Sequence, residues 1–174
     1  MLEIYQRLDR DERVQIVKPD YKLLLTHDER SRARLKAQTV TGEEIGIFLE
    51  HGQPLMLGDI LVTSCSKTVR VDGAAEPVLS ATCDDWRLFA RACYHLGNRH
   101  VKIQVAERTL RITPDHVLQS MLESLGLSVR QELAVFVPEN GAYHGHGHEH
   151  SHNDTDELQS DKKQPAHRFV RLHS

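Results

Sequence analysis

The fold is decided by residues 78–137, VLSATCDDWRLFARACYHLGNRHVKIQVAERTLRITPDHVLQSMLESLGLSVRQELAVFV. Segments of helical period alternate in this stretch with β-rich segments of period two. The predicted strands cover residues 78–83, 100–106, 109–112 and 128–137. A helix follows the first strand and another follows the third, which gives the order β-α-β-β-α-β of the ferredoxin-like arrangement. The stretch therefore predicts two helices packed on one face of an antiparallel sheet.

The first of these helices has predicted start and stop signals. Asp84 or Asp85 can cap its N-terminus, and Gly97 is expected to end it as a C′ glycine. Its expected apolar face consists of Trp86, Phe89, Ala90, Cys93 and Leu96. Because a buried thiol on this face cannot serve as a nucleophile, a Cys/His catalytic pair is not expected.

The second helix is predicted to open at Thr113-Pro114, with the hydroxyl as N-cap and proline at the first helical position. Gly126 is expected to close it. Its apolar stripe consists of Val117, Leu118, Met121, Leu122 and Leu125. His116 falls in its first turn and off that stripe, so its ring is expected at the surface.

Residues 1–72 predict a small β domain without a useful helical period. Residues 72–77 contain Gly, Pro and small side chains and suggest a linker, so residues 73–140 form the second predicted domain. Basic side chains alternate with smaller ones from Arg30 to Ala37, as on a strand with one solvated face. Such a face usually blocks edge pairing, and the open alternative is a docking edge for an acidic partner. The overall prediction is an α+β protein of two domains and a tail.

Residues 141–174 are dominated by polar side chains and should remain disordered without a ligand. This tail carries five histidines at every second position: His144, His146, His148, His150 and His152. Neutral imidazole is a ligand for nickel, zinc and copper, and the absence of a thiolate from the tail argues against a soft-metal site. The alternatives are a histidine-rich linker or a purification tag; the intervening Gly and Glu and the 22 residues that follow speak against a tag. The tail is therefore predicted to bind metal, with little selectivity.

Composition excludes several classes of protein. The chain has 22 Lys and Arg against 25 Asp and Glu, so it lacks the large basic surface needed to coat nucleic acid or anionic lipid. No apolar run approaches the roughly 18 residues of a membrane helix, and the N-terminus has no signal-peptide pattern. Three scattered cysteines exclude a disulfide framework and suggest the reducing cytoplasm. All three are expected to be small buried hydrophobes.

Histidines of the folded part differ in context. His100 follows the first helix and is expected at an exposed edge, where a hydrogen-bonding loop histidine is the common case. His27, His51 and His95 are interpreted as structural or surface residues. A metal-dependent hydrolase is disfavoured because no His-Glu-x-x-His or comparable fixed ligand set is present.

Several motifs together resemble the urease accessory nickel metallochaperones (UreE-type). They are residues 94–100 (YHLGNRH), Asp115-His116-Val117-Leu118 with Met121-Leu122, and Gly141-Ala142-Tyr143 before the histidine-rich tail. Leu25-Thr26, residues 29–32 and Gly58-Asp59 are also similar to that family. The resemblance covers essentially the whole chain.

The resemblance implies a non-enzymatic, cytoplasmic homodimer with a peptide-binding-like β domain and a ferredoxin-like metal-binding domain. It implies that His100 is the principal nickel ligand, contributed by both subunits, and that His116 is a secondary one. Some members carry a further histidine two positions before the latter, where this chain has Pro114. The tail histidines, with His167 and His173 as further candidates, would add ligands for Ni(II), and Zn(II) or Cu(II) would compete.

Partners implied by the resemblance are the urease accessory GTPase (UreG-type) and the apo-urease activation complex. The alternative function is a general nickel or zinc storage or buffering protein. That alternative predicts many equivalent sites and no dependence of urease activation on the protein.

Overall fold

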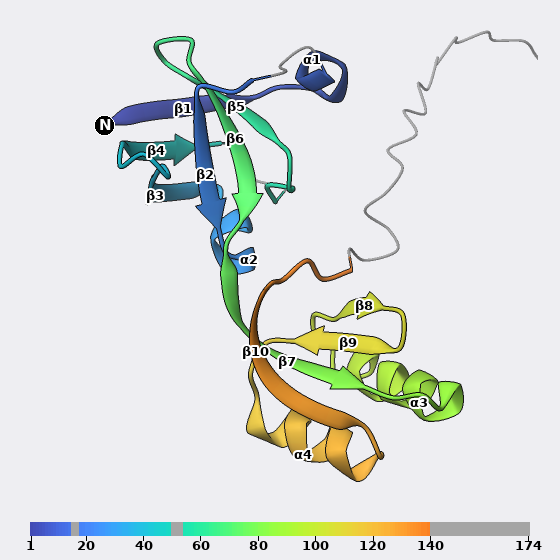
Figure 1. Ribbon diagram of the computed structural model, residues 1–174. Helices are drawn as coiled ribbons and strands as arrows, with labels where there is room; N and C mark the ends of the chain where they lie inside the picture. The colour runs from blue at the N-terminus through green and yellow to red at the C-terminus, as the bar shows by residue number, and fades with distance from the viewer. Residues whose placement is uncertain (15–17, 50–53, 140–174) are drawn as a thin grey trace, which may run out of the picture. The chain divides into compact units, whose positions relative to one another are not determined.

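The computed structural model describes residues 1–14, 18–49 and 54–139. Two sheets carry the fold, one of six strands and one of four (Figure 1). The α+β prediction is confirmed, with a β-rich N-terminal part followed by a β-α-β-β-α-β part. The predicted disorder of residues 141–174 lies outside the described residues.

The N-terminal sheet has the strand order β2-β6-β5-β1-β4-β3, with β3 at one edge. Its strands are β1 (Leu2–Arg7), β2 (Tyr21–Leu25), β3 (Arg34–Gln38), β4 (Glu44–Phe48), β5 (Ile60–Thr63) and β6 (Thr68–Gly73). Period two is clear in β2, where Leu23 and Leu25 are buried and Leu24 is half exposed. Two short helices, α1 (Arg10–Val14) and α2 (His27–Arg30), interrupt the strands.

The expected strand through Arg30 is wrong. Thr26 and Glu29 form a capping box, in which each side chain accepts from the other residue's backbone N–H, and this starts α2. Arg30 ends that helix and is only 3% exposed. The alternation of exposed basic side chains with partly buried ones holds from Arg34 onward, along the edge strand β3.

The linker prediction for residues 72–77 is wrong, because all of these residues except Ala74 belong to strands. β6 ends at Gly73 and β7 begins at Ala75, so a single residue separates the two sheets along the chain. Residues 75–77 pair with 133–135 of β10 in an antiparallel ladder. This pairing explains the error, because a long strand partner outweighs the loop preference of Gly and Pro.

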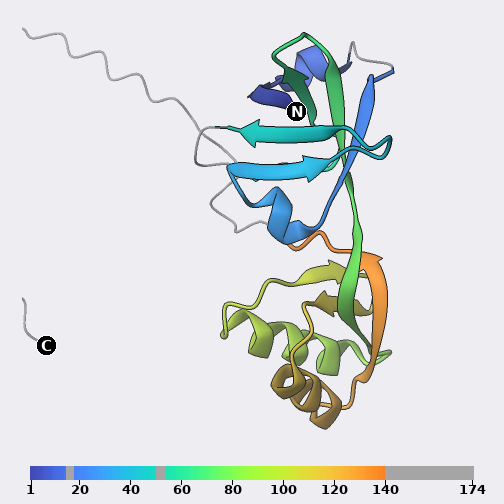
Figure 2. The same cartoon turned by 90° about the vertical axis from the view of Figure 1, so that its left-hand side faces the viewer.

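The C-terminal sheet has the antiparallel order β10-β7-β9-β8, and two helices pack into one core with it (Figure 2). Its elements are β7 (Ala75–Thr82), α3 (Trp86–Gly97), β8 (Gln104–Ala106), β9 (Thr109–Ile112), α4 (His116–Ser124) and β10 (Ser128–Val135). The ferredoxin-like prediction for this part is therefore confirmed.

Details of both helices correct the sequence prediction. Asp85 caps α3 as expected, but Trp86 and Ala90 are exposed, and the buried face consists of Phe89, Ala92 and Leu96. The start of α4 lies two residues later than predicted. Its cap is Asp115, which accepts from Val117 and Leu118 N–H, and Val117 is 62% exposed. Aspartate is preferred over threonine as an N-cap residue, so Asp115 starts the helix and Thr113 does not.

The predicted strand at residues 100–106 is shorter than expected: only Gln104–Ala106 form β8, and Val105 in it is 43% exposed. The cysteine prediction is also wrong in part, because Cys65 is exposed and Cys83 and Cys93 are partly exposed. All three are free thiols.

Candidate metal site

His100 occupies an unusual backbone position at the end of α3. The Val101 N–H donates to the Leu96 carbonyl (3.2 Å) and the His100 N–H donates to the Gly97 carbonyl (2.9 Å). These two bonds form a Schellman motif, in which His100 takes the C′ position with φ of 53°. The prediction that Gly97 fills this position is wrong, since Gly97 belongs to the helix and has no positive φ.

Helix α4 ends in the same way but with the usual residue. The Leu127 N–H donates to the Leu122 carbonyl (3.1 Å), the Gly126 N–H donates to the Glu123 carbonyl (2.9 Å), and Gly126 has φ of 92°. A glycine meets no steric penalty there, whereas a residue with a Cβ does. The chain therefore keeps an imidazole at a turn where glycine would fold more easily, which favours a functional role for His100.

The His100 side chain is exposed, as predicted. Its ring has no hydrogen-bond partner within residues 1–14, 18–49 and 54–139. The turn before it is braced by Arg99, whose Nη1 donates to the His95 carbonyl at 2.8 Å. An imidazole without a partner, held on a braced turn, is available to an external ligand.

His116 is the first residue of α4 and is also exposed. Its own carbonyl accepts from the Ser120 hydroxyl at 3.0 Å. The neighbouring Asp115 carboxylate is occupied by the two N–H groups that it caps. Thus His116 offers one imidazole as a ligand, and the Asp115 carboxylate beside it is already engaged in capping α4.

Neither histidine belongs to a complete ligand set in a single chain. The part of the chain that the structure describes contains no group of three or more His, Cys, Asp or Glu placed to hold a metal ion. The predicted ligands His144, His146, His148, His150 and His152 lie outside the described residues, as do His51, His167 and His173. A metal site at His100 therefore needs ligands from elsewhere, either a second chain or the tail.

The contacts of His27 have no recognisable signal in the amino-acid sequence. Its ring meets the Phe136 ring edge-on with centroids 5.5 Å apart, and its Nε2 lies 3.0 Å from the Lys102 Nζ. Burial lowers the pKa of His27, and the nearby charges of Lys102 and Arg30 lower it further, against a smaller opposing effect of Asp28. The neutral ring is thus the form that the fold favours.

Replacing His27 by glutamine should reduce the loss of stability in mild acid. The unfolded ring takes up a proton near pH 6.5, while the folded ring resists protonation, so stability falls as the pH drops below about 6.5 toward the lowered pKa. Urea denaturation of metal-free protein at pH 7.5 and 5.5 measures this, with His95→Gln as the control. Equal pH dependence in His27→Gln and wild type would contradict the assignment.

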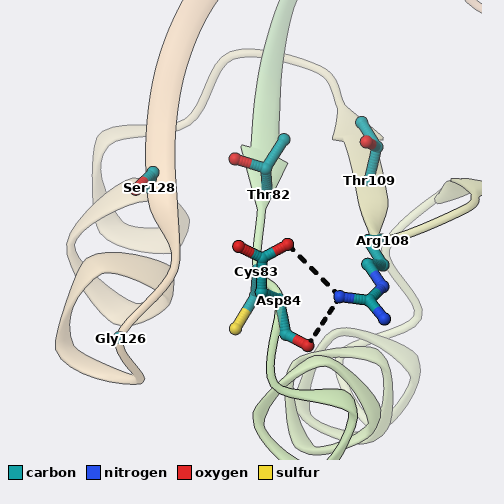
Figure 3. Close-up of a pocket in the computed structure, with 7 residues that line it drawn as sticks. All are labelled: Thr82, Cys83, Asp84, Arg108, Thr109, Gly126 and Ser128. Carbon is teal, nitrogen blue, oxygen red and sulfur yellow. Dashed lines mark hydrogen bonds and ion pairs between the residues drawn. The ribbon is translucent and has the colours of Figure 1, made fainter.

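A polar hollow of about 350 Å³ lies elsewhere in the C-terminal part. Figure 3 shows its lining: Thr82, Cys83, Asp84, Arg108, Thr109, Gly126 and Ser128. The Arg108 Nη1 donates to the carbonyl and to the Oδ1 of Asp84, at 3.1 and 3.3 Å. Because the cation is paired inside the hollow and no predicted metal ligand lines it, this hollow is not the metal site.

Among the residues described, no helix has the length and the apolar character to cross a membrane.

Comparisons with known proteins cover nearly the whole chain. The family model described as UreE urease accessory protein, N-terminal domain, matches residues 4–74, and the C-terminal domain model matches residues 76–167. A urease accessory protein UreE from Marinomonas sp. (strain MWYL1) is 54% identical over 147 residues, which are 83% of this chain and 97% of the relative. The UreE of Alteromonas mediterranea is 52% identical over 124 residues, 71% of this chain and 80% of the relative.

A more distant relative extends the match. The UreE of Pseudomonas fluorescens (strain Pf0-1) is 44% identical over 153 residues, covering 87% of this chain and 90% of the relative. The resemblance predicted from the motifs around residues 94–100 and 115–122 is confirmed. The chain belongs to the UreE family of urease accessory proteins, a non-enzymatic family.

Proposed function

We propose that this protein is a nickel metallochaperone that supplies Ni(II) for assembly of the urease metallocentre. Family membership implies nickel binding. The observation that points to a particular ligand is the position of His100. This exposed imidazole stands on a braced Schellman turn at a position that glycine would fill at lower conformational cost.

The primary site forms between two chains in this proposal. In a homodimer with two-fold symmetry, a residue near the axis meets its own copy, so two His100 rings can hold one ion. A single chain lacks a complete ligand group among its described residues, which favours a shared site. His116 is a weaker, secondary ligand, since its exposed ring has no second donor supplied by Asp115.

The tail completes the coordination shell and loads further ions. Histidines 144, 146, 148, 150 and 152 are borderline donors suited to Ni(II), so Zn(II) and Cu(II) would compete. Ligands on a tether can leave and return without disturbing the scaffold. The ion therefore keeps exchangeable positions, which transfer requires and catalysis would not tolerate.

The proposed recipients are the urease accessory GTPase (UreG-type) and, with it, the apo-urease activation complex. We expect the transfer to occur in the cytoplasm, in keeping with three free thiols. The edge strand β3 exposes Arg34 and Lys36, and a basic edge of this kind either protects against strand pairing or docks an acidic partner.

Removing the tail should lower nickel stoichiometry more than the affinity of the tightest site. Calorimetric titration would compare the whole chain with one that ends at Tyr143. A whole chain with histidines 144, 146, 148, 150 and 152 replaced by serine separates loss of imidazole from loss of length. The storage alternative predicts equivalent sites throughout, so loss of the tightest site with the tail would favour storage.

A further inference from the structure

Strand β3 leaves one edge of the N-terminal sheet open. It pairs with β4 in an unbroken antiparallel register that runs from Arg34 opposite Phe48 to Gln38 opposite Glu44. It is the last strand on that side of the sheet (Figure 1). An edge without a bulge or a proline can accept a further strand.

The backbone bonds at the two ends of β3 show which residues face away from β4. The Leu49 N–H donates to the Ala33 carbonyl and the Thr39 N–H donates to the Glu43 carbonyl, each at 2.9 Å, so the odd-numbered residues bond to β4. The N–H and C=O groups of the alternate residues point to the open edge: Arg34, Lys36 and Gln38. None of these groups has a hydrogen-bond partner within the described part of the chain.

Val40 continues this alternation. Its N–H, two residues beyond Gln38, donates at 2.9 Å to the Lys22 carbonyl of β2 and not to β4. This bond lies past the end of β3 and is the one backbone bond between the two edges among the residues described. The groups of residues 34, 36 and 38 thus remain available to a partner.

Arg34 and Lys36 determine the charge of this edge. Both side chains are exposed and lie on one face of the sheet, because they are two residues apart on a strand. Neither forms an ion pair with a residue that the structure describes. The two cations repel the same strand of a second copy and attract carboxylates of matching spacing. The edge is therefore protected against pairing with itself and is selective for an acidic strand.

A hollow of about 390 Å³ lies at the Gln38 end of the edge. Its lining consists of Met1, Lys36, Ala37, Gln38, Glu44 and Ile45. The side chain of Met1 is 62% exposed and offers an apolar contact, whereas the Glu44 carboxylate repels an acid. An added strand thus needs an apolar residue opposite Gln38 and acids opposite Lys36 and Arg34.

We propose that the open edge of β3 docks an acidic, extended segment of a partner protein, which adds to the N-terminal sheet as an antiparallel strand. From its N-terminus, the segment has an apolar residue, then an acidic residue two positions later and another two positions after that. Main-chain bonds to residues 34, 36 and 38 supply affinity, and the side chains that alternate along the segment supply specificity. This interaction requires no metal and goes beyond the proposed nickel site.

The test uses fluorescence anisotropy with the full chain, free of metal, and the fluorescein-labelled peptide Thr-Leu-Thr-Glu-Thr-Glu-Thr. The peptide should bind at low salt, and its affinity should fall as salt screens the exposed charges. In an antiparallel pair, the leucine and the two glutamates direct their N–H groups toward β3. N-methylation of these three residues should weaken binding at least about 10-fold, whereas N-methylation of the three threonines after the first should leave it within about 2-fold.

Charge reversal tests the same edge from the side of the protein. The double variant Arg34→Glu/Lys36→Glu should bind the peptide about 10-fold more weakly, because two exposed attractions become repulsions, and should prefer a peptide with lysine in place of both glutamates. The matched control is Arg87→Glu/Arg91→Glu, which makes the same change of net charge at two exposed positions of α3. That control should retain the preference for the acidic peptide.

Three results would overturn the inference. No binding of the acidic peptide by the full chain would leave protection as the role of the basic edge. Binding that survives N-methylation of the leucine and the glutamates would exclude strand addition. An equal loss in the β3 and α3 double variants would show that net charge, and not this edge, attracts the peptide.

Discussion

Replacing His100 by glycine is expected to stabilise the metal-free protein and to remove its tightest nickel site. The C′ residue of α3 has φ of 53°, where a Cβ is unfavourable and glycine is not. After allowing for the greater freedom of glycine in the unfolded chain, the gain should be about 0.5–1 kcal/mol. Loss of both paired imidazoles should weaken nickel binding at least about 100-fold, since even second-shell changes cost 10- to 100-fold.

Urea denaturation with a chelator present and calorimetric titration with nickel measure the two effects separately. His100→Ala is the informative companion, because it removes the ring and keeps the Cβ, so it should lose nickel without gaining stability. His100→Asn also removes the ring, but it introduces a residue that tolerates this backbone conformation. Lower stability in His100→Gly would contradict the described turn, and retained tight binding would contradict the ligand assignment.

Replacing Asp59 by asparagine should destabilise the N-terminal sheet by about 2–3 kcal/mol, because it removes the charge between two arginines. The Asp59 carboxylate is 1% exposed and accepts from the Arg7 Nη1 at 3.2 Å, from the Met56 N–H at 2.8 Å and from Arg13. This carboxylate ties α1 to the turn before β5. The side chains of Arg7 and Arg13 are 27% and 29% exposed, so the expected loss of stability is smaller than for a fully buried ion pair.

The matched control is Asp28→Asn. That carboxylate also pairs with an arginine, Arg32, but is 74% exposed, so the change should stay within about 0.5 kcal/mol. Thermal and urea denaturation measure both variants. Similar losses of stability in the two variants would show that burial of the Asp59 ion pairs contributes nothing to stability.

Much of the fold could be predicted from local signals. The Asp85 cap, the buried positions Phe89 and Leu96 and the closing Gly126 place the C-terminal helices, because capping and helical period act over a few residues. The exposed position of His100 followed from its place between helix and strand.

What could not be predicted depends on contacts distant in sequence. Arg30 looked like one member of a basic strand, but its guanidinium is buried against the carbonyl of Phe136, 106 residues away. The link between Gln104 and Val137 has no sequence signal either. Gly97 looked like the helix stop because glycine is the usual C′ residue, and only the backbone bonds reveal that His100 has that position.

The central claim is that one nickel ion is held by His100 from each of two chains. Anomalous diffraction at the nickel edge from crystals of the loaded protein tests it most directly. The account predicts a strong peak on a two-fold axis, with a His100 nitrogen of each protomer about 2.0–2.1 Å away, as for zinc–imidazole bonds. A strong peak with both His100 rings outside coordination distance would contradict it.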